Sequence, residues 1–223
     1  MGKSRIVIVG GSFGGLTVAH ELRRLLPPQE RDITLVAKED RFVFIPSLPW
    51  VAIGRETVEH ISFPLARSLR SSGISFVHGE VGRIDLGAQQ VFVGEESLPY
   101  DFLVIATGHR SANEAVPGLG PFDGPGHSLM SPKETEEARD AWGRFLENPG
   151  PVVVGSAPGA SCLGPAYEFA FEIDHLLKRR RMRHQVPITS SPRSPSSGTS
   201  ASVAWARRAS SWKGSSSSAT FAT

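Results

Sequence analysis

The sequence predicts an α/β fold with parallel strands, and three stretches carry that prediction. Residues 5–26, RIVIVGGSFGGLTVAHELRRLL, have the pattern of a buried strand, a glycine turn and an amphipathic helix. Residues 33–37, ITLVA, follow as a second buried strand at the distance expected after such a helix. Residues 152–171, VVVGSAPGASCLGPAYEFAF, repeat the order of strand, small-residue turn and helix. Two such units in one chain predict two Rossmann-like domains.

The first glycine turn has the spacing of a dinucleotide-binding fingerprint. The pattern G-x-G-x-x-G falls on Gly10, Ser12 and Gly15, and Gly14 is an additional glycine. Glycines there permit a tight turn and let the backbone approach a pyrophosphate, which the N-terminus of the following helix attracts. The alternative is a turn that only packs the helix against the strand. The two flanking buried strands favour the dinucleotide site.

Two apolar or proline-bearing segments follow. Residues 42–54, FVFIPSLPWVAIG, are expected to form a proline-punctuated loop whose apolar surface suits it to cover a ligand. The alternative is a loop buried for packing alone. A helix is expected over residues 62–72, with Pro64 in its first turn and Gly73 as its C-terminal stop.

The middle of the chain is expected to support these units. A strand is predicted over residues 73–77, and a β-meander around residues 90–94. Ser131 and Glu134 have the spacing of a capping box, which predicts a helix from there through Leu146.

Residues 100–108, YDFLVIATG, supply the motif that indicates a family. An early glycine fingerprint followed by a D-x-L-V-I-A-T-G strand resembles the FAD-dependent pyridine nucleotide-disulfide oxidoreductases, flavoproteins with two dinucleotide-binding domains. Within that superfamily, FVFIPSLPWVAIG and GASCLGPAYEFA resemble the sulfide:quinone oxidoreductases. The resemblance covers about residues 4–188, and its motifs occur in family order. It implies an oxidoreductase with FAD as its cofactor and sulfide and a quinone as substrates.

The resemblance also implies which residues contact FAD. They are Gly10, Gly11, Ser12, Phe13, Gly14 and Gly15 in the first turn, Ala37 and Lys38, Ile45 and Pro46, Val81, and Ala106, Thr107 and Gly108 in the A-T-G turn. Val81 matches a position whose backbone faces the adenine. The acidic residue that usually binds the ribose is absent, since Ala37 and Lys38 stand there with Glu39 just beyond. Recognition of the ribose by a side chain is therefore left open, and no metal site is predicted.

The second small-residue turn brings the chain's one cysteine to the start of a helix. Residues 155–160 read G-x-A-x-x-A, and each alanine adds a methyl group where a pyrophosphate needs close approach to the backbone. Pro158 also removes an N–H, so this turn disfavours a pyridine nucleotide. A helix N-terminus favours the thiolate of Cys162, although a lone cysteine can equally be a small buried hydrophobe. The resemblance favours redox chemistry, in which this cysteine accepts sulfide sulfur or joins a disulfide beside the flavin.

Glu168, in the P-A-Y-E motif, is a candidate acid/base partner of the cysteine, and a plain surface carboxylate is the alternative. Two positions depart from the family pattern. Met130 stands where many relatives have a further cysteine, and Glu134 where some have a histidine. The partner cysteine that the family has far downstream is absent, so this chain is expected not to turn over sulfide by itself.

The segment from Ser190 onward differs in composition, because it is rich in serine and has no acidic residue and no leucine. A disordered linker is one interpretation. Back-translation in GC-rich codons, read one frame away, yields FVTPEPFLGHFGVGGVGKARQLLEG, which is similar to what the family has there, so we interpret the segment as out of frame. The expected domains are residues 1–125, an FAD-binding domain, and residues 126–188, a second nucleotide-type domain. Both are expected to be incomplete, and residues 189–223 to be a disordered tail.

Charge and targeting signals limit the function classes. Four of the 24 basic residues and none of the 22 acidic ones lie from Ser190 onward, so the net charge of +2 is no argument for nucleic acid. We expect no signal peptide or membrane-spanning helix, and hence a cytoplasmic protein or one bound peripherally to a membrane, as the family implies. Two alternatives stay open: an NAD(P)H:quinone or ferredoxin-type FAD reductase, and a fragment without enzymatic function.

Overall fold

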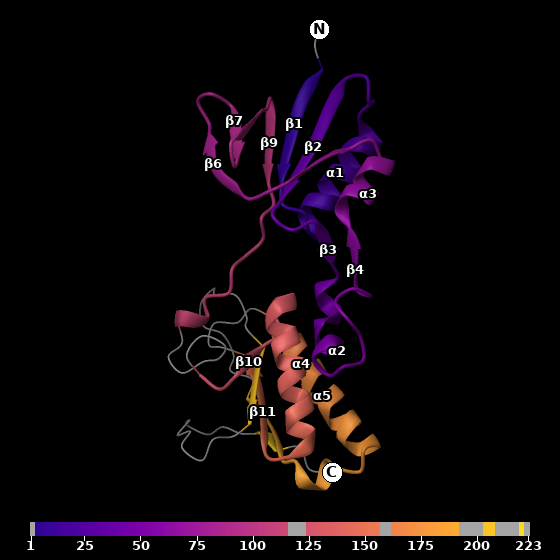
Figure 1. Ribbon diagram of the computed structural model, residues 1–223, viewed down its shortest axis with the longest axis vertical. Helices are drawn as coiled ribbons and strands as arrows, with labels where there is room; N and C mark the ends of the chain where they lie inside the picture. The colour runs from indigo at the N-terminus through magenta and orange to yellow at the C-terminus, as the bar shows by residue number, and fades with distance from the viewer. Residues whose placement is uncertain (1–2, 116–123, 157–161, 192–202, 208–218, 221–223) are drawn as a thin grey trace. The chain divides into compact units, whose positions relative to one another are not determined.

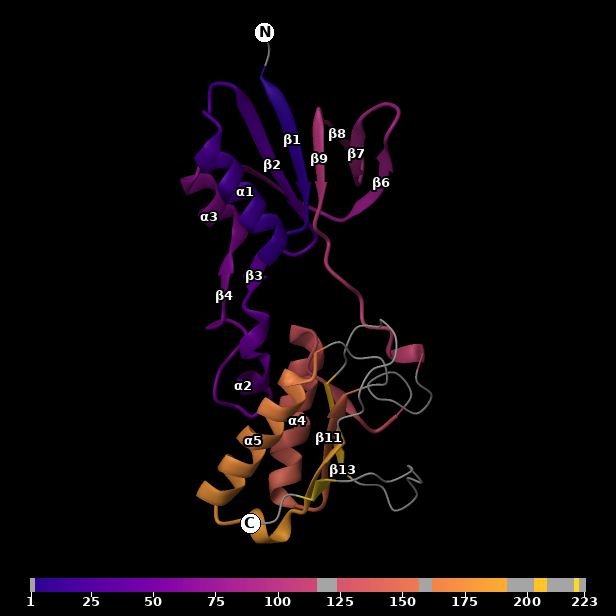
Figure 2. The ribbon, with the colours of Figure 1, turned by 180° about the vertical axis from the view of Figure 1, so that it is seen from behind.

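The structure is a computed structural model that describes residues 3–115, 124–156, 162–191, 203–207 and 219–220 (Figure 1 and Figure 2). The chain divides into two compact units. Unit 1 comprises Met1–Val43 and Ser62–His109, and unit 2 comprises Phe44–Ile61 and Arg110–Thr223. The predicted α/β fold with parallel strands is confirmed, whereas the predicted domain boundaries at residues 125 and 188 remain predictions.

Unit 1 is built on a parallel sheet of four strands. Its order is β5 (Ser75–His78), β2 (Arg31–Ala37), β1 (Ser4–Val9) and β9 (Phe102–Ile105). All three neighbouring pairs run parallel. The carboxyl ends of these strands therefore meet at one edge of the sheet, which is where open α/β sheets bind ligands.

The two faces of this sheet are covered by different elements, as the alternation of side chains along a strand requires. Ile6 and Ile8 of β1 pack with the helices α1 (Phe13–Leu25) and α3 (Leu65–Ser71). Val7 and Val9 of the same strand pack with an antiparallel meander. That meander consists of β6 (Val81–Asp85), β7 (Gln90–Val93) and β8 (Glu96–Pro99). Figure 1 shows the helices and the meander on opposite sides of the sheet.

The expected helix over residues 62–72 is wrong in its first turn. Residues Ser62–Pro64 form a short strand, β4, which pairs antiparallel with β3 (Arg41–Val43). Phe63 stacks on Phe42 with ring centroids 4.9 Å apart, and this contact favours the extended conformation. Pro64 is therefore the residue before α3, and its missing N–H leaves no helical hydrogen bond unmade. Gly73 ends the helix as predicted, with a φ of +67°.

Unit 2 contains a five-stranded mixed sheet in the order β10 (His127–Ser128), β13 (Val203–Arg207), β11 (Val152–Ser156), β12 (Ile188–Ser191) and β14 (Ala219–Thr220). β11 pairs parallel with β12 and antiparallel with β13. β13 and β14 lie in the segment for which the sequence predicted no order, and the structure describes only their backbone pairing. Between the described strands run the 3-10 helices η2 (Asn113–Ala115) and η3 (Arg183–Gln185).

The helices of unit 2 share one apolar core. They are α2 (Leu48–Ala52), α4 (Pro132–Glu147) and α5 (Gly164–Arg179). Phe169 and Ile173 of α5 are fully buried in this core, together with Ala52 of α2. The stretch at residues 42–54 was expected to be a loop, but it holds the 3-10 helix η1 (Ile45–Ser47) and α2. The apolar residues of α2 are buried in unit 2, and their burial stabilises this short helix.

Candidate functional site

The glycine turn between β1 and α1 is held by main-chain hydrogen bonds from both neighbouring strands. The amide of Gly10 donates to the carbonyl oxygen of Val36 at 2.8 Å. On the other side, the amide of Ala106 donates to the carbonyl oxygen of Val9 at 2.8 Å. These bonds bring the first turn, the end of β2 and the A-T-G turn together, three of the places predicted to contact FAD.

At three of the glycines a side chain would overlap neighbouring atoms. Gly10 has a φ of +122°, and a Cβ there would lie 2.1 Å from the carbonyl oxygen of Ala106. A Cβ on Gly15 would lie 1.8 Å from the carbonyl oxygen of Gly10. Gly11 is confined by Ala37 and Leu65, each 2.7 Å from its hypothetical Cβ. The close approach of Gly10 to Ala106, and of Gly15 to Gly10, thus requires glycine at positions 10 and 15.

The N-terminus of α1 is open to a ligand. Ser12 is the N-cap residue, it is exposed, and its side chain makes no capping hydrogen bond. The first turn contains no acidic residue, and Gly14 is exposed with only an ordinary contact, 3.6 Å, between its hypothetical Cβ and the Cβ of Ala106. Uncapped amides at a helix N-terminus attract anions, so this turn fits the pyrophosphate of FAD. Phe13 packs edge-on against Phe42, with ring centroids 5.0 Å apart.

The end of β2 differs from the usual pattern, as the sequence indicated. Ala37 is buried, and the exposed Lys38 follows it. The Nζ atom of Lys38 lies 3.4 Å from a carboxylate oxygen of Glu80, and a ring nitrogen of His78 lies 3.0 Å from the carbonyl oxygen of Lys38. The sequence did not single out Glu80, because its closeness to Lys38 depends on the pairing of β5 with β2.

The remaining predicted residues of unit 1 lie after the carboxyl end of β9 or at the start of the meander. Val81 begins β6 and is half-buried. Ala106 is half-buried after β9, while Thr107 and Gly108 are exposed. Gly108 has a φ of +75°, and no atom lies within 4 Å of its hypothetical Cβ. The turn after β9 therefore depends on the backbone conformation that glycine adopts readily.

The other predicted residues belong to unit 2. Ile45 and Pro46 form η1, and both are exposed. Cys162 is exposed and lies two residues before α5, while Glu168 is exposed on that helix. Among the residues that the structure describes, no hydrogen bond joins Cys162 to Glu168. The predicted G-x-A-x-x-A turn lies mostly outside the described residues, since 157–161 are not among them.

Glu134 has a positioning role in the fold. Its amide donates to the side chain of Ser131 at 3.3 Å, which confirms the predicted N-cap of α4. Its carboxylate accepts hydrogen bonds from the buried Ser128 at 2.8 Å and from Asn113 at 3.3 Å. Glu134 thus fastens β10 and η2 to the start of α4, which satisfies two buried polar side chains.

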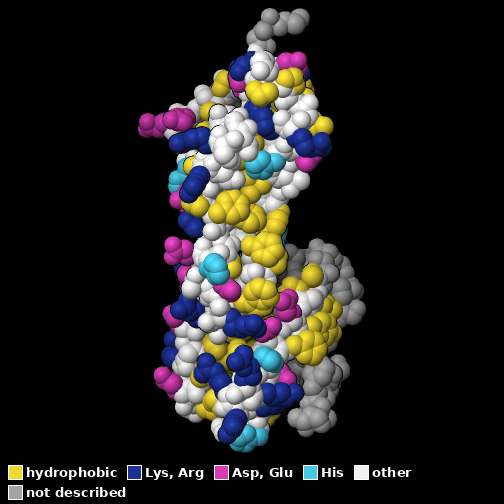
Figure 3. All heavy atoms as spheres, turned by 90° about the vertical axis from the view of Figure 1, so that its right-hand side faces the viewer, with side chains coloured by type: hydrophobic (Ala, Val, Ile, Leu, Met, Phe, Trp, Pro, Cys, Tyr) yellow, Lys and Arg dark blue, Asp and Glu magenta, His cyan; other side chains and the backbone are white. Residues whose placement is uncertain are grey.

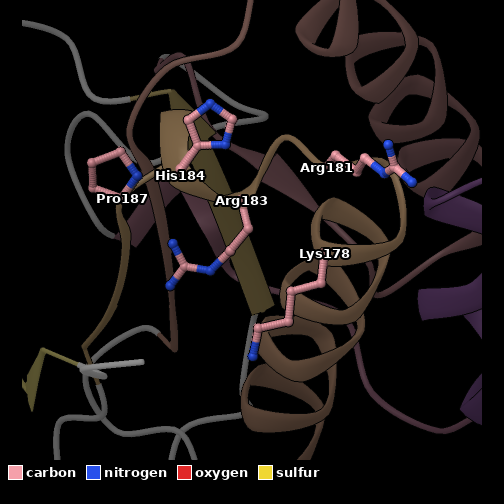
Figure 4. A pocket seen from close by; sticks show the side chains of 5 residues that line it. All are labelled: Lys178, Arg181, Arg183, His184 and Pro187. Carbon is pink, nitrogen blue, oxygen red and sulfur yellow. The ribbon is translucent and has the colours of Figure 1, made fainter.

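Basic side chains gather on the face of unit 2 over α5, shown in dark blue in the lower part of Figure 3. A hollow of about 550 Å³ lies there and is lined by Lys178, Arg181, Arg183, His184 and Pro187 (Figure 4). The Oδ2 atom of Asp174 lies 2.9 Å from Nζ of Lys178, and its Oδ1 atom lies 2.5 Å from Nε of Arg183. Burial raises the pKa of Asp174, but the hydrogen bonds from Arg183 and Lys178 outweigh it and hold that pKa below its usual value. The ion pair of Arg183 with Asp174 joins η3 to α5. Lys178, in the last turn of α5, complements the negative end of the helix dipole.

Across the described residues, no three His, Cys, Asp or Glu side chains gather in a way that could hold a metal ion. No helix within the described part of the chain combines the length and apolar character needed to cross a bilayer.

Comparison with known proteins confirms the family that the motifs indicated. Residues 4–164 match the family of pyridine nucleotide-disulphide oxidoreductases. The chain is 37% identical to the sulfide-quinone reductase of Aquifex aeolicus over 185 residues, 82% of the chain and 42% of that protein. It is 38% identical to a demethylphylloquinone reductase of Synechocystis over 127 residues, 52% of the chain and 31% of that protein.

Solved structures show the same likeness. The sulfide:quinone oxidoreductase of Aquifex aeolicus superposes with a TM-score of 0.78 and 36% identity, over 85% of this chain and 43% of that one. NDH2 of Plasmodium falciparum superposes with a TM-score of 0.62 and 19% identity over 84% of this chain and 41% of that one, which shows the fold alone. The chain spans less than half the length of these relatives.

Proposed function

The chain belongs to the pyridine nucleotide-disulphide oxidoreductase family, and from that premise we propose that it serves the oxidation of sulfide, or a related sulfur species, with a quinone as electron acceptor. The members of this family are FAD-binding flavoproteins. The proposal of sulfide rests on the likeness to the Aquifex aeolicus enzyme, and that of a quinone also on the likeness to the Synechocystis quinone reductase.

The residues of unit 1 fit FAD. The open N-terminus of α1 would hold its pyrophosphate, and the end of β2 with Lys38 would lie along its adenosine half. The A-T-G turn at residues 106–108 would close over the flavin side, with Val81 facing the adenine. When bound, FAD supplies a carrier that accepts two electrons from the sulfur species and passes them to the quinone.

One observation carries the proposed chemistry: the thiol of Cys162 is exposed at the start of α5. A cysteine buried for packing was the alternative, and an exposed thiol is instead accessible to a sulfur substrate. Joining the sulfur of hydrosulfide to the Cys162 thiolate forms an S–S bond and releases one proton and two electrons. A quinone that takes up two electrons and two protons becomes a quinol, so the two half-reactions balance in electrons.

The remaining expectations are proposed with it. Glu168, exposed on the same helix, would accept the proton released at Cys162. The boundaries at residues 125 and 188, and the out-of-frame origin of residues 189–223, belong to the same proposal. Contact with a membrane surface is proposed because the quinone that serves as the electron acceptor is a lipid-soluble substrate.

The test is anaerobic titration of the FAD-loaded chain with sulfide, monitored by bleaching of the flavin absorbance. In the protein whose reading frame is restored from residue 190 onward, we expect the wild-type sequence to bleach and Cys162→Ser to keep its FAD but to bleach at least about 100-fold more slowly, because the serine hydroxyl stays protonated and is a poor nucleophile. Glu168→Gln is expected to slow the reaction by about 10-fold.

NADH in place of sulfide separates this proposal from the alternative of an NAD(P)H:quinone reductase. Bleaching by NADH and not by sulfide would assign the chain to that class. If Cys162→Ser and wild type bleach with sulfide at equal rates, Cys162 has no redox role.

A further inference from the structure

The carboxylate that usually binds the ribose in dinucleotide-binding folds is missing from the end of β2. That position carries Ala37, which is buried, and Lys38, which is a cation. FAD contains a ribose with two hydroxyl groups in its adenosine half, and a carboxylate at this edge is their common partner. The structure provides a carboxylate from another strand.

That carboxylate is Glu80, and its main chain is held beside the end of β2. β5 pairs parallel with β2, and His78 is the partner of Ala37 in the register. The amide of Gly79 then donates to the carbonyl oxygen of Ala37 at 2.9 Å. A Cβ on Gly79 would lie 2.4 Å from a methyl group of Val93, so the meander allows no side chain there. The main chain just before Glu80 is therefore held in place by β2 on one side and by β7 of the meander on the other.

The side chain of Glu80 is held but accessible. Lys38 Nζ lies 3.4 Å from its Oε1 atom, and the two side chains are 64% and 70% exposed. A pair this exposed contributes little to stability, so its removal leaves the fold unchanged. The carboxylate retains free acceptor positions, because an ionised carboxylate has about four lone-pair sites.

We propose that Glu80, oriented by Lys38, binds the hydroxyl groups of the ribose in the adenosine half of FAD. This inference rests on FAD being the cofactor. Glu80 directly precedes Val81, which is proposed to face the adenine, and contacts Lys38, another proposed FAD contact. It follows β5, at the sheet edge where the carboxyl ends of β2 and β5 meet. Glu80, in the segment between β5 and β6, thus supplies the carboxylate that the end of β2 lacks.

The experiment compares the Kd for FAD with the Kd for an FAD analogue whose adenosine ribose lacks both hydroxyls, measured by flavin fluorescence. We expect wild-type protein to bind the analogue about 10-fold more weakly than FAD, because the charge-assisted hydrogen bonds are lost. Glu80→Gln is expected to bind FAD about 10-fold more weakly than wild type and to show no preference between the two ligands. Its thermal midpoint should equal that of wild type.

The matched control is Glu39→Gln, which removes the exposed acid next to Lys38 in the sequence and is expected to keep both the affinity and the preference. If Glu80→Gln keeps the wild-type preference for FAD, or if Glu39→Gln loses it, the assignment of Glu80 is overturned while FAD binding stands. If wild-type protein binds neither ligand, the assignment of the cofactor fails and this inference fails with it.

Discussion

Gly10 and Gly14 lie in the same turn, but the structure gives them different roles. Gly10 has a φ of +122°, and any Cβ there would overlap the carbonyl oxygen of Ala106. Gly14 is exposed in the first turn of α1 and has room for a side chain. The first glycine therefore serves the fold, and the second is the one that we propose leaves space for the pyrophosphate of FAD.

We predict that Gly10→Ala lowers the free energy of unfolding by at least about 2 kcal/mol, because strain in the backbone adds to the overlap. Gly14→Val should change that free energy by less than about 1 kcal/mol but should abolish binding of FAD. Urea unfolding and the flavin content of the purified protein measure the two effects. A Gly14→Val protein that retains flavin would contradict the assignment of this turn.

At the level of elements, a charged clamp made by Arg5 and Asp101 joins the N-terminal end of β1 to the residue before β9. The main-chain amide of Arg5 donates to Asp101 at 2.7 Å, and its guanidinium donates to the same carboxylate at 3.0 Å. The side-chain hydrogen bond from Arg5, and then the one from its amide, lower the pKa of Asp101 from its usual value of 3.8. The aspartate of the D-x-L-V-I-A-T-G motif thus holds the edge strand β9 against the sheet.

This clamp predicts a dependence of stability on pH. Because the pKa of Asp101 is lower in the folded protein, its contribution is complete above pH 3.8 and is lost as the pH falls through the folded-state pKa. The difference in thermal midpoint between wild type and Asp101→Asn should therefore be constant near neutral pH and shrink below pH 3.8. Asp32→Asn, which breaks only the exposed pair with Lys3 at 3.2 Å, is the control and should change the midpoint less. A difference that stays constant to pH 2 would contradict the role of the clamp.

At the scale of the whole molecule, each unit has its own hydrophobic core. The core of unit 1 lies on both faces of its parallel sheet, and the core of unit 2 lies between its helices and its mixed sheet. Phe169 is the largest fully buried side chain among the described residues, while Phe171 on the same helix is 59% exposed. The two phenylalanines lie on one helix and differ in burial, so they form a matched pair.

We predict that Phe169→Ala lowers the free energy of unfolding by about 3–5 kcal/mol, because it leaves a cavity in the core. Phe171→Ala should lower it by less than about 1 kcal/mol. Denaturant unfolding followed by circular dichroism measures both. Similar losses for the two variants would show that the core of unit 2 is not packed as described.

The sequence by itself determined the features that depend on near neighbours along the chain. The strand–glycine–helix order around Gly10, the stop at Gly73 and the cap at Ser131 could be predicted, since each depends on the chemistry of a few adjacent residues. The motifs also determined the family. Only the tertiary structure decided that Ser62–Pro64 pairs as a strand, that Leu48–Ala52 fills the core of unit 2, and that Glu80 lies beside Lys38. Each of these depends on partners far away in the sequence, and the free energy of burying apolar surface or pairing strands overrides local preference there.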